Sequence, residues 1–280
     1  MAGGGFDSDL ALERRKIDTE ISGIDYRREN SPVGIWERIT VRTEEGAESI
    51  GRPKGIYDTL TTDRMDRLSR SEIDDACEEI ARELCIVFER ESIRPGRILV
   101  LGLGNGELTP DSVGPRTARE IYPTLHISRG NYEMFEGLEC SEIAVLTPGV
   151  ESESGMETSL VVGGICKMIR PDVVIAVDAL ASRSPERLGR TVQISTTGII
   201  PGSGIGNHKN AIDENTLGAP VIAIGVPTVI SSDSFTAELQ NKESGKEYGM
   251  LVSPKEIDGI VKAAAQIISG GINQAFGISY

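Results

Sequence analysis

The chain lacks the segments on which several broad function classes depend. No apolar run in its 280 residues approaches the roughly 18 residues that a membrane span needs, so we expect no membrane association. The first residues have neither a basic start nor an apolar core, so the sequence predicts no secretory signal and a cytoplasmic location. The formal net charge of -14 opposes binding to a phosphate backbone, and we therefore expect no direct nucleic-acid partner.

Cysteine and histidine are also scarce. The four cysteines, Cys77, Cys85, Cys140 and Cys166, are scattered, with no C-x-x-C pair and no neighbouring histidine. This spacing argues against a zinc ribbon and against a disulfide framework, so we expect reduced and mostly buried thiols. There are two histidines and no G-x-S-x-G motif, which leaves little support for a serine or cysteine nucleophile.

Nucleotide-binding motifs are absent as well. The glycines of Gly102–Gly106 follow an apolar run, as in a dinucleotide-binding loop, but the third glycine position of that motif is Glu107. A carboxylate there would repel a pyrophosphate, and the chain has no G-x-x-x-x-G-K-[ST] loop. We expect no nucleotide cofactor.

Strand and helix patterns alternate from Arg97 to the C-terminal region. Strands are predicted at 98–101, 142–147, 173–177, 191–195 and 221–226, and helices at 114–121, 159–169 and 254–268, the last ending at Gly270-Gly271. Such alternation is typical of parallel strands with helices on both faces. The sequence therefore predicts an α/β fold, a three-layer α/β/α domain with a mostly parallel sheet.

The N-terminal third is expected to add further elements to that domain. Residues 1 to about 30 are polar and predict a mobile arm with a short helical piece at 10–16, and residues 35–43 alternate like a strand at a sheet edge. A helix is expected to open at Ser71, with Asp74 completing a capping box. No linker divides the chain, so residues 10–280 are expected to form a single domain.

Two aspartates follow apolar runs in Gly-rich surroundings. Asp111 lies in the loop after 98–101, and Asp178 comes directly after 173–177. Open α/β sheets keep their active sites at the carboxyl ends of their strands, so we expect the two carboxylates to meet. Repulsion and desolvation would then raise the pKa of one of them, and the pair could activate water for attack on an amide.

Each aspartate also has a structural interpretation. Asp111 could cap the helix that begins near Val113. Asp178 follows five apolar residues, and a buried carboxylate needs a partner, for which Arg116, Arg183 or a second carboxylate are candidates.

A second Gly-rich loop runs from Gly198 to His208. It is either a flexible surface loop or a stretch of backbone that lines a cleft and binds an extended peptide. His208 beside Asp111 and Asp178 would complete a metal-binding set, so a divalent metal is the alternative to having no cofactor.

Several segments resemble, in the same order, the germination proteases of endospore-forming bacteria, an atypical aspartic peptidase family. These segments are residues 50–57, 103–115, 177–183, 193–199, 201–207, 217–229 and 270–273. The family is related in fold to the hydrogenase maturation proteases, in which the corresponding acidic positions contact nickel. That relationship keeps the metal alternative open.

The resemblance implies an endopeptidase that begins the degradation of small acid-soluble spore proteins in the spore core at germination. It places the catalytic pair on Asp111 and Asp178, with no metal required, and implies a homo-oligomer, a tetramer in the family. The residues expected to contact substrate are Asn105, Arg183, Gly204, Gly206 and Asn207. The alternative to an enzyme is a non-catalytic module that binds a peptide without cutting it.

The family is also made as a zymogen that loses an N-terminal propeptide. The stretch from Asp7 to Glu13 resembles its processing junction, which would place the cut between Asp9 and Leu10 and make residues 1–9 the propeptide. The alternative is an ordinary frayed terminus. Two departures from the family pattern are a shorter segment at 231–251 and a less basic stretch at 208–210.

Overall fold

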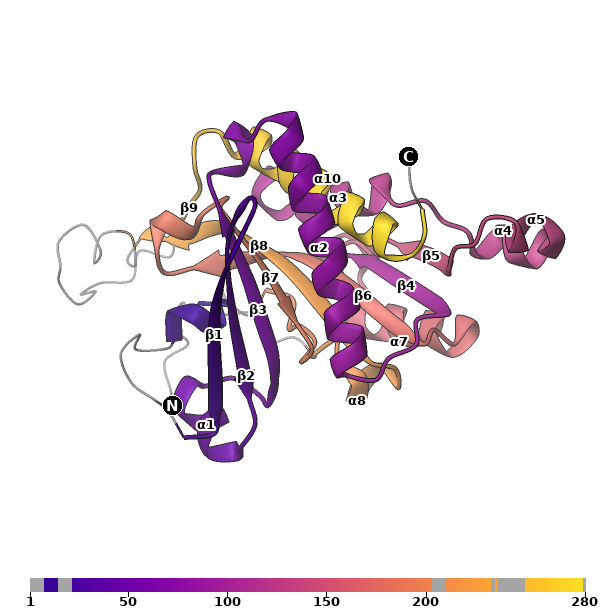
Figure 1. Cartoon of the computed structure of the whole chain (residues 1–280), viewed down its shortest axis with the longest axis horizontal. Helices are drawn as coiled ribbons and strands as arrows, with labels where there is room; N and C mark the ends of the chain where they lie inside the picture. Colours follow the sequence, from indigo (N-terminus) through magenta and orange to yellow (C-terminus); the bar gives the residue numbers. More distant parts are fainter. Residues whose placement is uncertain (1–7, 15–21, 203–209, 233–234, 236–249, 279–280) are drawn as a thin grey trace.

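A computed structural model describes residues 8–14, 22–202, 210–232, 235 and 250–278 (Figure 1). In the part of the chain that it describes, one nine-stranded sheet has the order β1-β2-β3-β7-β8-β6-β4-β5, with β9 beside β8. Helices cover both faces, so the protein has the α/β fold that the sequence predicts.

The strands are β1 Ile24–Ser31, β2 Gly34–Val41, β3 Gly55–Thr62, β4 Arg97–Gly102, β5 Glu142–Leu146, β6 Val173–Ser182, β7 Thr191–Ser195, β8 Val221–Ser231 and β9 Leu251–Val252. The helices are α1 Glu44–Ile50, α2 Arg70–Arg90, α3 Val113–Glu120, α4 Leu125–Gly130, α5 Tyr132–Glu136, α6 Glu151–Ser154, α7 Thr158–Ile169, α8 Glu214–Leu217 and α10 Ile257–Ala275. Short 3-10 helices are η1 Ala11–Arg14, η2 Met65–Arg67, η3 Thr109–Asp111 and η4 Pro185–Arg187.

The sheet has a parallel half and an antiparallel half. Strands β5, β4, β6 and β8 are parallel, which matches the alternation of strands and helices after Arg97. Strands β7, β3, β2 and β1 continue the sheet in antiparallel pairs. The prediction of an edge strand at 35–43 was wrong in one respect, because β2 lies between β3 and β1. The true edge strand, β1, is largely polar and exposed, so its sequence carries no apolar pattern.

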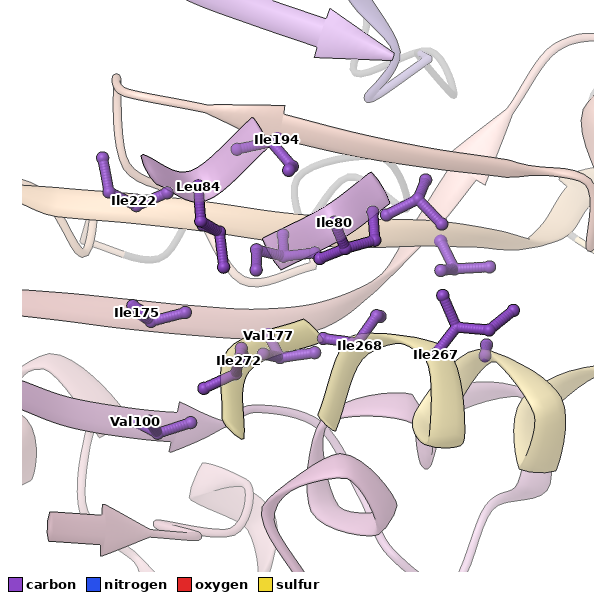
Figure 2. Close-up of a cluster of buried hydrophobic side chains, with 14 of the residues drawn as sticks. Ile80, Leu84, Val100, Ile175, Val177, Ile194, Ile222, Ile267, Ile268 and Ile272 are labelled. Atoms are coloured by element: carbon purple, nitrogen blue, oxygen red, sulfur yellow. The ribbon is translucent and has the colours of Figure 1, made fainter. Parts of the chain in front are cut away.

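The main core lies between the sheet and the pair α2 and α10, which cross the same face in Figure 1. Figure 2 shows the side chains of Ile80 and Leu84 on α2 and Ile268 on α10 close to strand residues such as Ile175. A second cluster on the opposite face packs α7 against β4 and β6. The three layers follow from this division.

Two helix boundaries differ from expectation. Helix α2 begins at the N-cap Ser69, whose hydroxyl accepts from Glu72 N–H while the Glu72 carboxylate accepts from Ser69 N–H, so the capping box lies two residues before the predicted one. Helix α10 does not end at Gly270-Gly271. A Cβ at these positions would lie 2.5 Å from Cys77 Sγ and 2.6 Å from Ile80 Cβ, so the glycines allow α10 to pack closely on α2.

A buried ionic group joins β2, β3 and α2. Arg38 donates hydrogen bonds to the fully buried Glu83, and Arg90 lies 3.3 Å from Asp58, which is also fully buried. Burial above all, then a hydrogen bond and repulsion from Glu83, raises the pKa of Asp58 to about 8. Beside this group, Trp36 Nε1 donates to a carboxylate oxygen of Glu79 at 2.7 Å.

Residues 8–13 are buried or half-buried, in contrast to the mobile arm that the sequence predicts. Leu10 and Ala11 are fully buried, and Leu12 is 7% exposed. Ala11 and Leu12 pack against Ile39 and Tyr57 on the same face of the sheet as α7. Polar composition did not reveal this docking, because the anchors are three apolar residues and hydrogen bonds to residues far away in the sequence. Within the described residues, no helix is both long and apolar enough to cross a membrane.

Candidate active site

Strand β6 carries Asp178 past the end of its neighbour. Strand β4 stops at Gly102, which pairs with Val177, whereas β6 continues to Ser182 because it stays paired with β8. Asp178 therefore lies inside a strand, not after it as predicted. Its side chain is 4% exposed, and Oδ1 accepts from the N–H of Ala179 at 2.9 Å.

Asp111 approaches from the loop that follows β4. It ends the 3-10 helix η3, and the N-cap of α3 is Ser112, so the capping interpretation of Asp111 does not hold. Instead, Asp111 Oδ2 accepts from the main-chain N–H of Asn105 at 2.7 Å. The Asn105 side chain in turn accepts from Glu107 N–H at 2.8 Å, so Asn105 orders the loop that holds Asp111.

Gly114 brings that loop against the strands. A Cβ on Gly114 would lie 2.3 Å from the Leu103 carbonyl oxygen and 2.4 Å from that of Val177. Only glycine permits this approach of α3 to the main chain of β6. The packing places Asp111 beside the part of β6 that carries Asp178.

Both aspartates line one cavity of about 280 Å³. Its walls are largely apolar and include Leu108, Leu180 and Leu251. The structure thus brings together the two carboxylates that the sequence predicts to act as a pair, and their catalytic role stays a prediction. Thr228, at an irregularity in the pairing of β6 with β8, also lines the cavity, and its buried hydroxyl has no hydrogen-bond partner among the residues that the structure describes.

The third carboxylate in this cavity belongs to Asp9, next to the predicted processing bond. Asp9 N–H donates to the Ala181 carbonyl at 3.0 Å, and Ala181 N–H donates to Asp9 Oδ2 at 2.9 Å. The Asp9 carbonyl accepts from Gln193 Nε2 at 3.3 Å. The N-terminal segment is therefore held in the cavity by main-chain and side-chain hydrogen bonds on both sides of Asp9.

Glu13 anchors the other end of this segment. Its carboxylate, 6% exposed, accepts from Arg183 N–H at 2.7 Å, from Ser184 N–H at 3.1 Å and from the Ser182 hydroxyl. Arg183, a predicted substrate contact, thus binds the N-terminal segment through its main chain, while the residue itself is exposed. The N-terminal segment thus lies alongside residues 182–184, at the end of β6 and just beyond it.

Four of the other residues singled out by the sequence are outside the part of the chain that the structure describes. Gly204, Gly206, Asn207 and His208 fall in 203–209, outside the described residues, and so does most of 231–251. The metal alternative is therefore not tested through His208, and the described residues hold no group of three or more His, Cys, Asp or Glu side chains placed to bind a metal. Arg116, a candidate partner for Asp178, has Nη2 at 3.4 Å from Oδ1 of Asp258 and so pairs with that carboxylate.

Sequence reasoning missed Gln193. It lies in β7, whose five residues are all buried, and it lines a second cavity of about 230 Å³ that shares Asp9 and Leu180 with the first. A polar residue between Val192 and Ile194 in a buried strand was the available signal. A further cavity between β1, β2 and α2 is lined by Arg38, Arg42 and Arg90, each with a carboxylate partner.

Comparison with known proteins identifies the family. The sequence model described as germination protease matches residues 7–241. A germination protease from Caldanaerobacter subterraneus is 36% identical over 97% of this chain and 94% of its own length, and one from Clostridium perfringens is 32% identical over 96% and 94%. One from Oceanobacillus iheyensis is 38% identical over 86% of this chain and 69% of its own length.

Among solved structures, a NiFe hydrogenase maturation protease HycI from Thermococcus kodakarensis is 19% identical with a TM-score of 0.37, covering 67% of this chain and 96% of that one. The α/β assignment rests on the sheet of this chain itself. The family is shown by the match to the family model and by the identity to relatives that the chain covers over most of their length. The chain belongs to the germination protease family and is a peptidase with a role in spore germination.

Proposed function

We propose that the chain is an endopeptidase of aspartic type in which Asp111 and Asp178 act as an acid and base pair. The observation that carries this proposal is that both carboxylates line one cavity together with Asp9, beside the bond resembling the family's processing junction. A non-catalytic peptide-binding module gives no reason for this coincidence.

The chemistry requires one ionised and one protonated carboxyl group. The ionised group takes a proton from water, and the water oxygen attacks the carbonyl carbon of the peptide bond. The protonated group gives its proton to the amide nitrogen as the C–N bond breaks, which leaves a carboxyl group and an amine. The apolar walls of the cavity favour such a division, because burial disfavours two charges side by side.

The first bond cut is proposed to be Asp9–Leu10 of the chain itself. Residues 1–9 would leave as a propeptide, and the chain from Leu10 onward would be the active form. Support comes from the placement of Asp9 in the cavity and from Glu13, which holds the segment from the C-terminal side of the cut. In trans, the proposed substrates are small acid-soluble spore proteins in the spore core, acted on by a homo-oligomer.

The test compares three purified full-length chains, namely wild type, Asp111→Asn and Asp178→Asn. Each is incubated with a small acid-soluble spore protein, with and without a chelator, and the products and the N-terminus are read by mass spectrometry. We expect the wild type to cut in both conditions and to acquire Leu10 as its N-terminus, and both variants to lose at least about 10²-fold in rate.

A fully active Asp178→Asn chain would contradict the aspartate pair. Loss of activity in chelator, restored by one divalent metal, would select a metal-dependent peptidase using Asp111, Asp178 and His208. Saturable binding of the spore protein with no turnover would favour the binding module.

A further inference from the structure

We propose that Gln193 is a third catalytic group, whose side-chain amide binds the carbonyl oxygen of the bond being cut. This inference rests on the proposed function. It concerns the Asp9–Leu10 bond first, because that bond is the peptide held at Gln193 in this structure.

The sheet register places Gln193 opposite Asp178. Asp178 on β6 pairs with Gly225 on β8, and Gly225 pairs with Gln193 on β7. Residues paired across a sheet project on the same face, so Asp178 and Gln193 share one face, with their main chains two strand spacings or about 10 Å apart. Gly225 between them carries no side chain, and the Leu180 side chain packs directly over it, with Cγ 2.4 Å from where a Cβ would lie, so that Leu180 lines both the cavity of the aspartates and the cavity of Gln193.

The packing of β7 confirms on which face of the sheet the Gln193 side chain lies. Val192 and Ile194, the neighbours of Gln193, both point into the core under α2 and α10, so Gln193 points to the opposite side of the sheet. Val177, the neighbour of Asp178, points into the same core, so Asp178 also points away from it. Asp178 and Gln193 thus project from the same face of the sheet, on which Asp9 contacts Gln193 and lines the cavity that also holds Asp178.

Gln193 holds that peptide on both sides of the bond. Its Nε2 donates to the Asp9 carbonyl at 3.3 Å, and its Oε1 accepts from Ala11 N–H at 2.9 Å. Leu10, between these two contacts, is fully buried. The amide therefore spans the Asp9–Leu10 bond and fixes its orientation relative to the cavity that holds Asp111 and Asp178.

The chemical consequence concerns the oxygen of Asp9. When water adds to the carbonyl carbon, the C=O electron pair moves to the oxygen, which becomes an oxyanion. Gln193 Nε2–H strengthens its hydrogen bond to this developing charge, and when the C–N bond breaks the pair returns to re-form the carbonyl. A donor held in place by a buried strand loses little free energy in reorganising, and such donors contribute about 10²–10³ in rate.

The experiment uses the full-length chain and measures the first-order appearance of the form that begins at Leu10. In its ionised form, Gln193→Glu removes the donor to the Asp9 carbonyl and keeps an acceptor for Ala11 N–H. Gln193→Met removes both hydrogen bonds and keeps a side chain of similar size. Gln266→Glu, the same change at an exposed position of α10, is the matched control.

Hydrogen exchange at the Ala181 amide reports separately whether Asp9 stays docked, since that amide donates to Asp9. We expect Gln193→Glu and Gln193→Met to convert about 10²-fold more slowly than wild type, with Ala181 still protected. Gln266→Glu is expected to convert at the wild-type rate.

Three results would overturn the inference. Conversion of Gln193→Met, which has no donor, at the wild-type rate shows that donation to the carbonyl is not needed. Slow conversion in both variants, accompanied by loss of Ala181 protection, shows that Gln193 only docks the segment. If the wild type neither converts nor cuts a spore protein, the proposed function itself fails, and the inference fails with it.

Discussion

Gly114→Ala tests how the active site is assembled. Its added methyl group would lie 2.3 Å from the Leu103 carbonyl oxygen and 2.4 Å from that of Val177. Carbon atoms at Cβ do not approach neighbours within 3.0 Å, so α3 or the strands must move by about 0.7 Å. Neither neighbour is a side chain that can rotate away, because both are main-chain atoms of the sheet region.

The expected cost has two parts. Overpacking of a well-packed interior destabilises the folded state by about 1–3 kcal/mol. The same shift moves Asp111 relative to Asp178, and a misplacement near 1 Å costs about 10²-fold in rate. Urea unfolding followed by circular dichroism measures the first part, and the rate of cutting at Asp9–Leu10 measures the second.

Gly164→Ala is the matched control. Gly164 lies inside α7, and a Cβ there would meet no atom within 4 Å. Because glycine lowers helix stability relative to alanine, this variant should gain roughly 1 kcal/mol and keep its activity. If Gly114→Ala unfolds at the wild-type urea concentration and cuts at the wild-type rate, the close approach does not position the site.

Asp58→Asn should flatten the pH dependence of stability. In the wild type, the pKa of Asp58 in the folded chain is about 8, above the usual 3.8, so the folded chain binds more protons than the unfolded chain over this range. The free energy of unfolding of the wild type should therefore fall by up to about 4 kcal/mol from pH 5 to pH 8. Equal slopes for the two chains in urea titrations would contradict this. Trp36→Phe should cost about 1–3 kcal/mol in thermal unfolding, because Glu79 loses a buried hydrogen-bond donor, and an unchanged melting temperature would refute it. A thiol reagent at pH 8 should label the exposed Cys85 well before Cys77, since burial above all raises the pKa of Cys77 to about 12; equal labelling rates in the folded chain would argue against that burial.

Apolar periodicity predicted the parallel half of the fold well. Strands β4 and β5 and helices α3 and α7 lie within one or two residues of their predicted ranges, because buried strands are continuous apolar runs and amphipathic helices repeat every 3.6 residues. The antiparallel β1 was missed since its residues are polar on both faces. The end of β6 was misplaced because a carboxylate interrupts the run although pairing with β8 continues through it.

The candidate site was predictable only in part. Asp111 and Asp178 could be found because each carboxylate follows a long apolar run, which places it near the carboxyl end of a buried strand, where open α/β sheets keep their active sites. The docking of Asp9 could not, because its partner Ala181 contributes only main-chain groups, which any sequence provides. Gln193 carried too weak a signal by itself, since its role emerges only from the register of three strands.

The pairing of Asp9 with Ala181 has a consequence for the order of folding. These residues are separated by 172 positions, so the N-terminal segment leaves the ribosome long before the strand that receives it exists. Contacts of such sequence separation form late, because the chain between them must first be ordered. The first described residues to be synthesised are therefore among the last to be placed, and the Asp9–Leu10 bond reaches the two aspartates only after β6 and β7 have joined the sheet. Under the proposed function, self-cleavage at Asp9–Leu10 would therefore have to await the completion of the fold.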